Sequence, residues 1–110
     1  MAVSNTDDHL RNHGFLLTPE GWRLSPMFDV NPVPYGDTLS MSVIGDDARI
    51  DLGLALSAAP HFGLSAGQAE AEAKRMLERI RRDWRATALE SGLSRAAIQT
   101  MEPAFMLCNG

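Results

Sequence analysis

The strongest constraint on the fold is a long amphipathic segment in the second half of the chain. Ser65 and Gln68 form a capping-box pattern, in which each side chain can bond to the backbone amide of the other, and Gly92 supplies a stop signal. Between these signals, apolar residues recur at spacings of three and four: Ala69, Ala73, Met76, Leu77, Ile80, Trp84 and Ala88. The pattern predicts one long helix that ends near Gly92 and buries this stripe.

Two further helices are predicted, one on each side of the long helix. Asp51 can cap a helix over residues 52–59, which Pro60 helps to end. Ser94 begins a last helix that Pro103 breaks, and its apolar positions are Ala97, Ile98 and Met101.

The first third of the chain is predicted to be a loop, a hairpin and a second loop. Residues 1–13 are short, polar and aperiodic. Residues 15–18 and 22–24 are β-prone runs that flank the turn residues Pro19-Glu20-Gly21. Residues 25–37 contain Pro26, Pro32 and Pro34, and proline fixes φ and biases the preceding residue to extended geometry. This segment is therefore expected to be a stiff loop.

Residues 39–44 alternate apolar and polar side chains, which is the period of a strand. Gly45-Asp46-Asp47 is a predicted turn. Together these signals predict a mainly α (α+β) fold, with a small N-terminal hairpin followed by about three helices. The length of 110 residues predicts a single domain over residues 1–110.

Composition excludes several classes of protein. Apolar residues make up 45% of the chain, charged residues 22%, and the net charge of −4 gives no general attraction to nucleic acid or anionic membranes. No run approaches the roughly 20 apolar residues of a membrane-spanning helix, and Asp7 and Asp8 interrupt any signal-peptide core. Cys108 is the only cysteine and has no partner for an internal disulfide. We expect a cytoplasmic protein that does not enter a membrane.

The residues that carry chemistry gather near the start of the chain. Asp7 and Asn12 stand five positions apart, and Asp29 follows the aromatic Phe28 further on. In phosphoryl transfer one carboxylate orients the attacking hydroxyl, while an amide oxygen and a second carboxylate hold magnesium. Protein-kinase catalytic loops have the same D-x-x-x-x-N spacing, with a metal-binding D-F-G downstream. Taken alone, Asp7 and Asn12 are also common turn residues that bond to nearby backbone amides.

The wider pattern resembles a known family. Residues 5–16 read N-T-D-D-H-L-R-N-H-G-F-L and residues 21–32 read G-W-R-L-S-P-M-F-D-V-N-P. They resemble the C-terminal catalytic region of HipA-like serine/threonine kinases, whose motif is T-D-x-H-x-x-N, a hairpin, then W-R-L-x-P-x-x-D. That family comprises the toxin kinases of bacterial toxin–antitoxin pairs and their relatives. The resemblance is specific over residues 5–32, continues more loosely through the capped helix, and implies part of a kinase C-lobe.

The resemblance implies a role for each matching residue. Asp7 would be the catalytic base, and Asn12 and Asp29 would be the magnesium ligands. His9 would brace the loop. Arg11 falls where the family has Lys or Arg, near the phosphates or the peptide, and is equally well interpreted as a solvated cation. The implied reaction transfers the γ-phosphoryl group of ATP to a Ser or Thr hydroxyl of a protein substrate.

The family grips ATP with an N-terminal lobe that has no counterpart here. Its glycine-containing phosphate loop, strand lysine and adenine hinge are absent, and Lys74, the only lysine, lies on the predicted long helix. Residues 63–67 are not a phosphate loop, because no strand precedes them and no Lys-Ser/Thr follows. We expect ATP and Mg²⁺ to bind tightly only in a full-length parent, of which this chain would be a C-terminal fragment. The chain alone, without the main cationic clamp on the phosphates, is expected to be inactive.

Two other interpretations remain open. The chain would be a non-catalytic helical interaction module if it binds a partner through the surface that the missing lobe normally covers. More remotely, Asp7, Asp8, His9 and His13 form a ligand set that could hold a transition metal and activate water in a hydrolase. His61, in an apolar stretch, is expected to be a packed structural histidine.

The charged residues of the predicted long helix indicate which partners the protein could bind. Its cations, Lys74, Arg75, Arg79, Arg81, Arg82 and Arg85, are interleaved with acids, and Glu70–Lys74 and Glu78–Arg82 have the i,i+4 spacing of ion pairs. This pattern favours a solvated, self-paired face. The resemblance implies a helix-turn-helix antitoxin as partner, with DNA contacted only indirectly through it. Exposure of the surface that faced the missing lobe also predicts self-association.

Overall fold

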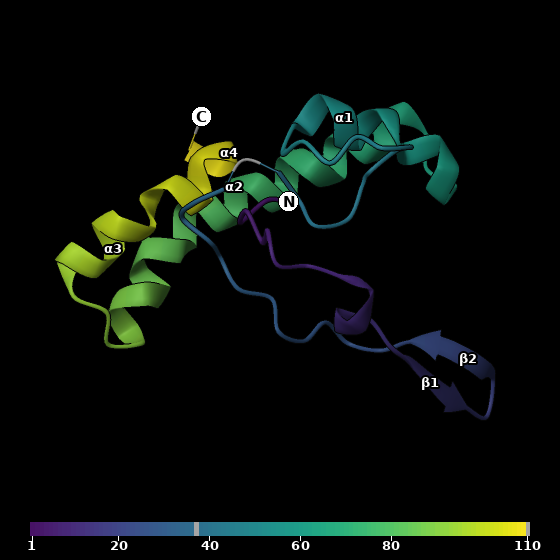
Figure 1. Ribbon diagram of the computed structural model, residues 1–110, viewed down its shortest axis with the longest axis horizontal. Coiled ribbons are helices and arrows are strands. Elements are labelled where there is room, and N and C mark those ends of the chain that lie inside the picture. Colours follow the sequence, from purple (N-terminus) through teal and green to yellow (C-terminus); the bar gives the residue numbers. More distant parts are fainter. Residues whose placement is uncertain (37, 110) are drawn as a thin grey trace.

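The structure is a computed structural model that describes residues 1–36 and 38–109 (Figure 1). The elements in chain order are the 3₁₀ turn η1 (Leu10–Asn12), β1 (Phe15–Thr18), β2 (Gly21–Leu24), α1 (Leu52–Ser57), η2 (Ala59–Phe62), α2 (Ala66–Glu90), α3 (Arg95–Met101), η3 (Glu102–Phe105) and α4 (Met106–Asn109). The α+β class and the order of hairpin before helices are confirmed. None of the described helices is both long and apolar enough to cross a bilayer.

Helix α2 is the axis against which α1, α3 and α4 pack (Figure 1). Its capping box is present as predicted: the Gln68 N–H donates to Ser65 Oγ at 3.2 Å, and the Ser65 N–H donates to Gln68 Oε1 at 3.1 Å. Gly92, with φ of 93°, takes the left-handed conformation that ends the helix at little steric cost. Local sequence therefore fixed both ends of this helix.

The core lies where the second half of α2 meets α3 and η3. The rings of Trp84 and Phe105 stack with centroids 4.0 Å apart and planes inclined by 6°. Ile98 and Ala104 complete the buried cluster. Beside it, Arg85 on α2 makes a bidentate ion pair with Glu102 on η3, whose shortest N–O distance is 2.7 Å. Pro103 breaks the regular helix as predicted, so that α3 passes into a 3₁₀ turn.

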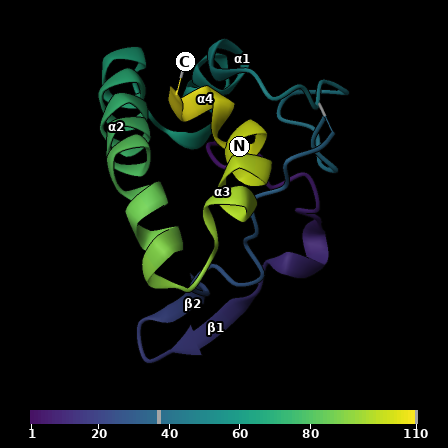
Figure 2. The same cartoon turned by 90° about the vertical axis from the view of Figure 1, so that its left-hand side faces the viewer.

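The hairpin is also confirmed. β1 and β2 pair antiparallel in the register Phe15–Leu24, Leu16–Arg23, Leu17–Trp22 and Thr18–Gly21. The Ser25 N–H donates to the carbonyl of Gly14 at 2.8 Å, so that the backbone pairing extends one residue beyond the strands. Figures 1 and 2 show the hairpin projecting away from the helices.

The segment between the hairpin and α1 differs from the prediction. Residues 39–44 are not a strand; within the described part of the chain, this region makes only the isolated bridges Thr38–Arg49 and Ile44–Asp47. The predicted turn at residues 45–47 is present and folds the segment back on itself. A strand needs a partner with a continuous ladder, and alternation of side chains cannot supply one. The alternation still appears in burial, because residues 39, 41 and 43 are half-buried while residues 40 and 42 are exposed.

Smaller predictions also need correction. The first helix is capped by Asp51 as expected but ends at Ser57, because the chain passes into the 3₁₀ turn η2, which has Pro60 in its first turn. Met76 is 56% exposed and is not a core residue. His61 is exposed rather than packed. Of the predicted loop over residues 25–37, residue 37 lies outside the described residues, and the rest has no regular structure.

The charges of α2 are paired differently from the i,i+4 prediction. Arg75 pairs with Glu72, and Arg82 pairs with the adjacent Asp83. The predicted pairs Glu70–Lys74 and Glu78–Arg82 are not among the ion pairs of the described residues. Exposed partners have little energetic preference for one spacing, because such pairs each contribute less than about 1 kcal/mol.

Replacing Phe105 by Ala should destabilise the protein strongly. The ring is 7% exposed and stacks on Trp84, so its loss leaves a cavity and is expected to lower the free energy of unfolding by about 3–4 kcal/mol. The same change at Phe62, which is 74% exposed, should cost no more than about 0.5 kcal/mol. Urea denaturation followed by circular dichroism measures both, and equal losses would contradict this description of the core.

Candidate active site

Two residues of the predicted site meet in the structure although they are far apart in sequence. Asn12 Nδ2 donates a hydrogen bond to Asp29 Oδ2 at 3.1 Å. Asn12 is 8% exposed, whereas Asp29 is exposed to solvent. The contact joins the loop before the hairpin to the loop after it, because the antiparallel hairpin brings its two ends together.

Local structure fixes the side chain of Asn12. The η1 turn is closed by a bond from the Asn12 N–H to the carbonyl of His9 at 2.9 Å. In return, Asn12 Oδ1 accepts the N–H of His9 at 3.1 Å. Both ends of the amide are thus engaged, so that Asn12 is held in one orientation toward Asp29.

Asp29 is held from both sides and sits in a strained backbone conformation. Its second oxygen, Oδ1, accepts a bond from Asn31 Nδ2 at 2.9 Å. Its φ of 54° is in the left-handed region, and Ser4 is the other non-glycine residue with positive φ in the described part of the chain. Such conformations cost about 1–3 kcal/mol and cluster at functional sites. Sequence analysis missed Asn31, which the common side-chain bonding of Asn in turns could have suggested.

The pair fits a magnesium ion in its donor chemistry. Magnesium takes hard oxygen ligands, often only one or two from protein, and fills the other positions with water and phosphates. Each Asp29 oxygen accepts one described hydrogen bond and so keeps a lone pair for a cation. At present the nitrogen of the Asn12 amide faces Asp29; turning the amide over would place its oxygen there and would release the His9 N–H. Asn12 and Asp29 are therefore the residues that could hold the ion.

Asp7 lies in a turn of the same loop and is exposed. None of the hydrogen bonds or ion pairs in the described part of the chain engages its carboxylate, so it can meet a substrate from solvent. Arg11 is exposed as well. The neighbouring Asp8 is instead engaged, because its Oδ1 lies 2.7 Å from His13 Nε2.

Polar groups are buried in this loop to a degree that the rest of the chain does not match. The buried polar residues of the described chain are Ser4, Asn5 and Asn12, and all three lie in the first twelve residues. Two buried atoms, Asn5 Oδ1 and His9 Nδ1, have no hydrogen-bond partner. A buried polar atom without a partner costs about 1–3 kcal/mol. The loop thus has an energetic cost on both sides of Asp7. Sequence analysis included Asn5 in the family motif without a role and did not single out Ser4.

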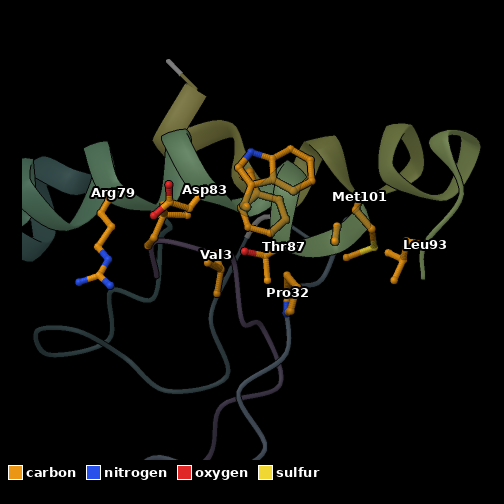
Figure 3. Close-up of a pocket in the computed structure, with 11 residues that line it drawn as sticks. Val3, Pro32, Arg79, Asp83, Thr87, Leu93 and Met101 are labelled. Carbon is orange, nitrogen blue, oxygen red and sulfur yellow. The ribbon is translucent and has the colours of Figure 1, made fainter. Parts of the chain in front are cut away.

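The loops that carry Asp7 and Asp29 rest on the helical core. Val3 and Pro32 line a groove of about 510 Å³ whose other walls come from α2, α3 and their surroundings (Figure 3). Val3 also packs against the buried cluster around Trp84. At the end of the chain, the buried Cys108 thiol donates to the carbonyl of Ala2 at 3.1 Å, and burial raises the pKa of this thiol. The position of the site therefore depends on the core.

The four residues proposed as ligands of a metal-dependent hydrolase do not form a metal site. Within residues 1–36 and 38–109, no three side chains of His, Cys, Asp or Glu are arranged to hold a metal ion. Asp8 and His13 form a pair, but Asp7 and His9 do not join them in such a group. The geometry favours the oxygen pair of Asn12 and Asp29 instead.

Replacing Asn12 by Ala should destabilise the protein more than replacing Asn31. Both amides donate to Asp29, but Asn12 is buried and its loss also leaves the half-buried His9 N–H without its acceptor. The expected loss in free energy of unfolding is about 1–3 kcal/mol for Asn12→Ala and no more than about 0.5 kcal/mol for Asn31→Ala. Urea denaturation measures the difference, and equal effects would show that the Asn12 contact does not stabilise the loop.

Comparison with known proteins identifies a family. The family model described as HipA-like C-terminal domain matches residues 1–86, a range that contains Asp7, Asn12, Asp29 and most of α2. α3, η3 and α4 lie outside the match. No curated protein and no solved structure matches the chain. The match covers well over half of the chain, and the protein therefore belongs to the HipA-like C-terminal domain family.

Proposed function

We propose that this chain carries the catalytic loop and the metal site of a protein serine/threonine kinase. The reaction is transfer of the γ-phosphoryl group of ATP to a Ser or Thr hydroxyl. The observation that carries the proposal is the hydrogen bond from Asn12 to Asp29 at 3.1 Å. It places a side-chain amide beside a carboxylate, and the two residues come from opposite ends of the hairpin. Family membership supports the same assignment.

Asp7 has the role of base in this proposal. Its exposed carboxylate accepts the proton of the substrate hydroxyl as the hydroxyl oxygen forms its bond to the γ-phosphorus. The bond from that phosphorus to the bridging oxygen breaks, and ADP leaves. Asp7 acts mainly by orienting the hydroxyl, since positioning and electrostatics dominate this class of reaction.

Asn12 and Asp29 would hold the divalent cation in this proposal, and the cation would supply neutralising charge for the ATP phosphates. The hydrogen bond from Asn31 Nδ2 holds the Asp29 carboxylate in place. Arg11, exposed on the same loop, is available to a phosphate or an acidic peptide. Lys74 is exposed on α2 and is not part of the loop, so the chain by itself lacks a lysine at the phosphates.

The biological setting proposed is that of a toxin kinase with a helix-turn-helix antitoxin. Family membership is its support. Any contact with DNA would pass through the antitoxin, because cations of α2 such as Arg75 and Arg85 are already paired with acids of the chain.

Metal binding tests the proposed site in the chain as it stands. Titration with Mn²⁺, followed by electron paramagnetic resonance, should detect one weak site with a Kd on the order of 10⁻⁴–10⁻³ M. Asp29→Asn should abolish it, since the carboxylate is the charged ligand, whereas Asp7→Asn should leave it unchanged. Asp46→Asn, which removes an exposed acid from the turn at residues 45–47, is the matched control. Binding that survives Asp29→Asn would contradict the assignment.

Phosphoryl transfer is tested with radiolabelled ATP, using the chain and any longer in-frame product of the same gene. The chain alone should transfer nothing measurable, because no cationic clamp holds the phosphates. Transfer by a longer product should fall by about 10²–10⁴-fold on Asp7→Asn and should also be lost on Asp29→Asn. Full transfer after Asp7→Asn would overturn its role as base, and tight ATP binding by the chain alone would overturn the expected inactivity.

A further inference from the structure

One face of the hairpin consists entirely of large apolar side chains that no described part of the chain covers. Directly paired residues on antiparallel strands share a face, and so do alternate residues along one strand. The register therefore places Phe15, Leu17, Trp22 and Leu24 on the same side. We call these four residues the hairpin face. Each of them is at least 64% exposed.

The opposite side of the hairpin has a different character. It carries Leu16 opposite Arg23 and Thr18 opposite Gly21. The charged residues of residues 14–25 are Glu20, which lies in the turn, and Arg23, which lies on this opposite side. The hairpin face itself therefore carries no charge, and covering it would leave no charged group buried and unpaired.

We propose that the hairpin face is a dimer interface, and that its occupant is the hairpin face of a second copy of this chain. Two such faces are self-complementary under a two-fold axis, since both are uncharged and each presents a Phe–Leu pair beside a Leu–Trp pair. Packed face to face, the two hairpins form a small two-layer sandwich. The opposite side is less suited to this packing, because covering it would bury the charge of Arg23 without a partner.

The available area is sufficient for such a dimer. A buried aromatic side chain contributes about 150–250 Å². At their observed exposures, the four side chains have an accessible surface on the order of 500 Å² per copy. A dimer could therefore bury about 1,000 Å² in total. This total is at the lower limit for a specific interface, so a weak, concentration-dependent dimer is expected. An apolar patch of this size is comparable to the largest one on a typical monomer, and such patches are often functional.

The hairpin also needs a partner for its own stability. A two-stranded hairpin is marginally stable alone in water, and this one projects from the helices with one face bare (Figures 1 and 2). Pairing two hairpins would provide the packing that α2 does not. The inference is independent of phosphoryl transfer, because none of the four residues was assigned a role in the proposed chemistry.

Sedimentation velocity of the full chain, from roughly 5 to 500 μM, tests the proposal across the range of weak interfaces. We expect the weight-average mass to rise from monomer toward dimer. The variant Leu17→Thr/Trp22→Thr, which places a β-branched residue favoured in strands at both positions, should remain monomeric. Leu16→Thr makes the same kind of change on the opposite side of β1 and should dimerise like the unmodified chain. Circular dichroism checks that all three proteins keep their helices.

Fluorescence supplies a second readout that needs no variant. Trp22 is exposed and Trp84 is buried, so association through the hairpin face should shift the emission to shorter wavelength and reduce quenching by acrylamide as concentration rises. A monomer over the whole range would overturn the proposal. Dimers that persist in Leu17→Thr/Trp22→Thr, or that form without protecting Trp22, would also overturn it, because another surface or edge-to-edge strand pairing would then hold them. Loss of the dimer on Leu16→Thr alone would assign it to the opposite side.

Discussion

The stack of Trp84 on Phe105 supports the rest of the molecule. It joins the long helix α2 to the turn that follows α3, with Ile98 and Ala104 filling the space around it. A helix as long as α2 is stabilised mainly by packing of one face rather than by propensity. The N-terminal segment depends on the same contact, because Val3 packs against this cluster four residues before Asp7.

The candidate site is built differently from the core. It depends on directional contacts between polar groups, and the link from Asn12 to Asp29 is its central one. The unpaired buried atoms Asn5 Oδ1 and His9 Nδ1, together with the left-handed backbone of Ser4 and Asp29, cost stability without adding apolar contact. A chain with so small a core would not keep these features for folding alone. Strained backbone of this kind clusters at functional sites.

The hairpin contributes both to the candidate site and to the exposed apolar surface of the protein. Its backbone pairing brings Asn12 and Asp29 together, while its side chains leave a bare apolar face. These two roles do not conflict. The site depends on the backbone pairing and on the residues at the ends of the strands, whereas the hairpin face consists of side chains within the strands. Whatever covers that face therefore also stiffens the support of the site, since hairpin stability rises when one face is packed.

Local signals in the sequence were enough for the elements whose causes are local. The capping box of α2, the caps Asp51 and Ser94, the Pro-Glu-Gly turn of the hairpin and the break at Pro103 all involve residues within a few positions of one another. The spacing of Asp7, Asn12 and Asp29 also named the site candidates in advance. The roles of these three residues stay predictions.

Tertiary structure alone decided which of these local possibilities became contacts. The predicted core stripe of α2 is wrong at Met76, because packing partners alone determined that Trp84 is buried and Met76 exposed. Residues 39–44 have the alternation of a strand without a ladder partner, so they are not one. The meeting of Asn12 with Asp29, and the second amide from Asn31, depend on the path of the chain through the hairpin. Sequence periodicity fixes which side chains share a face, but only long-range packing fixes what that face meets.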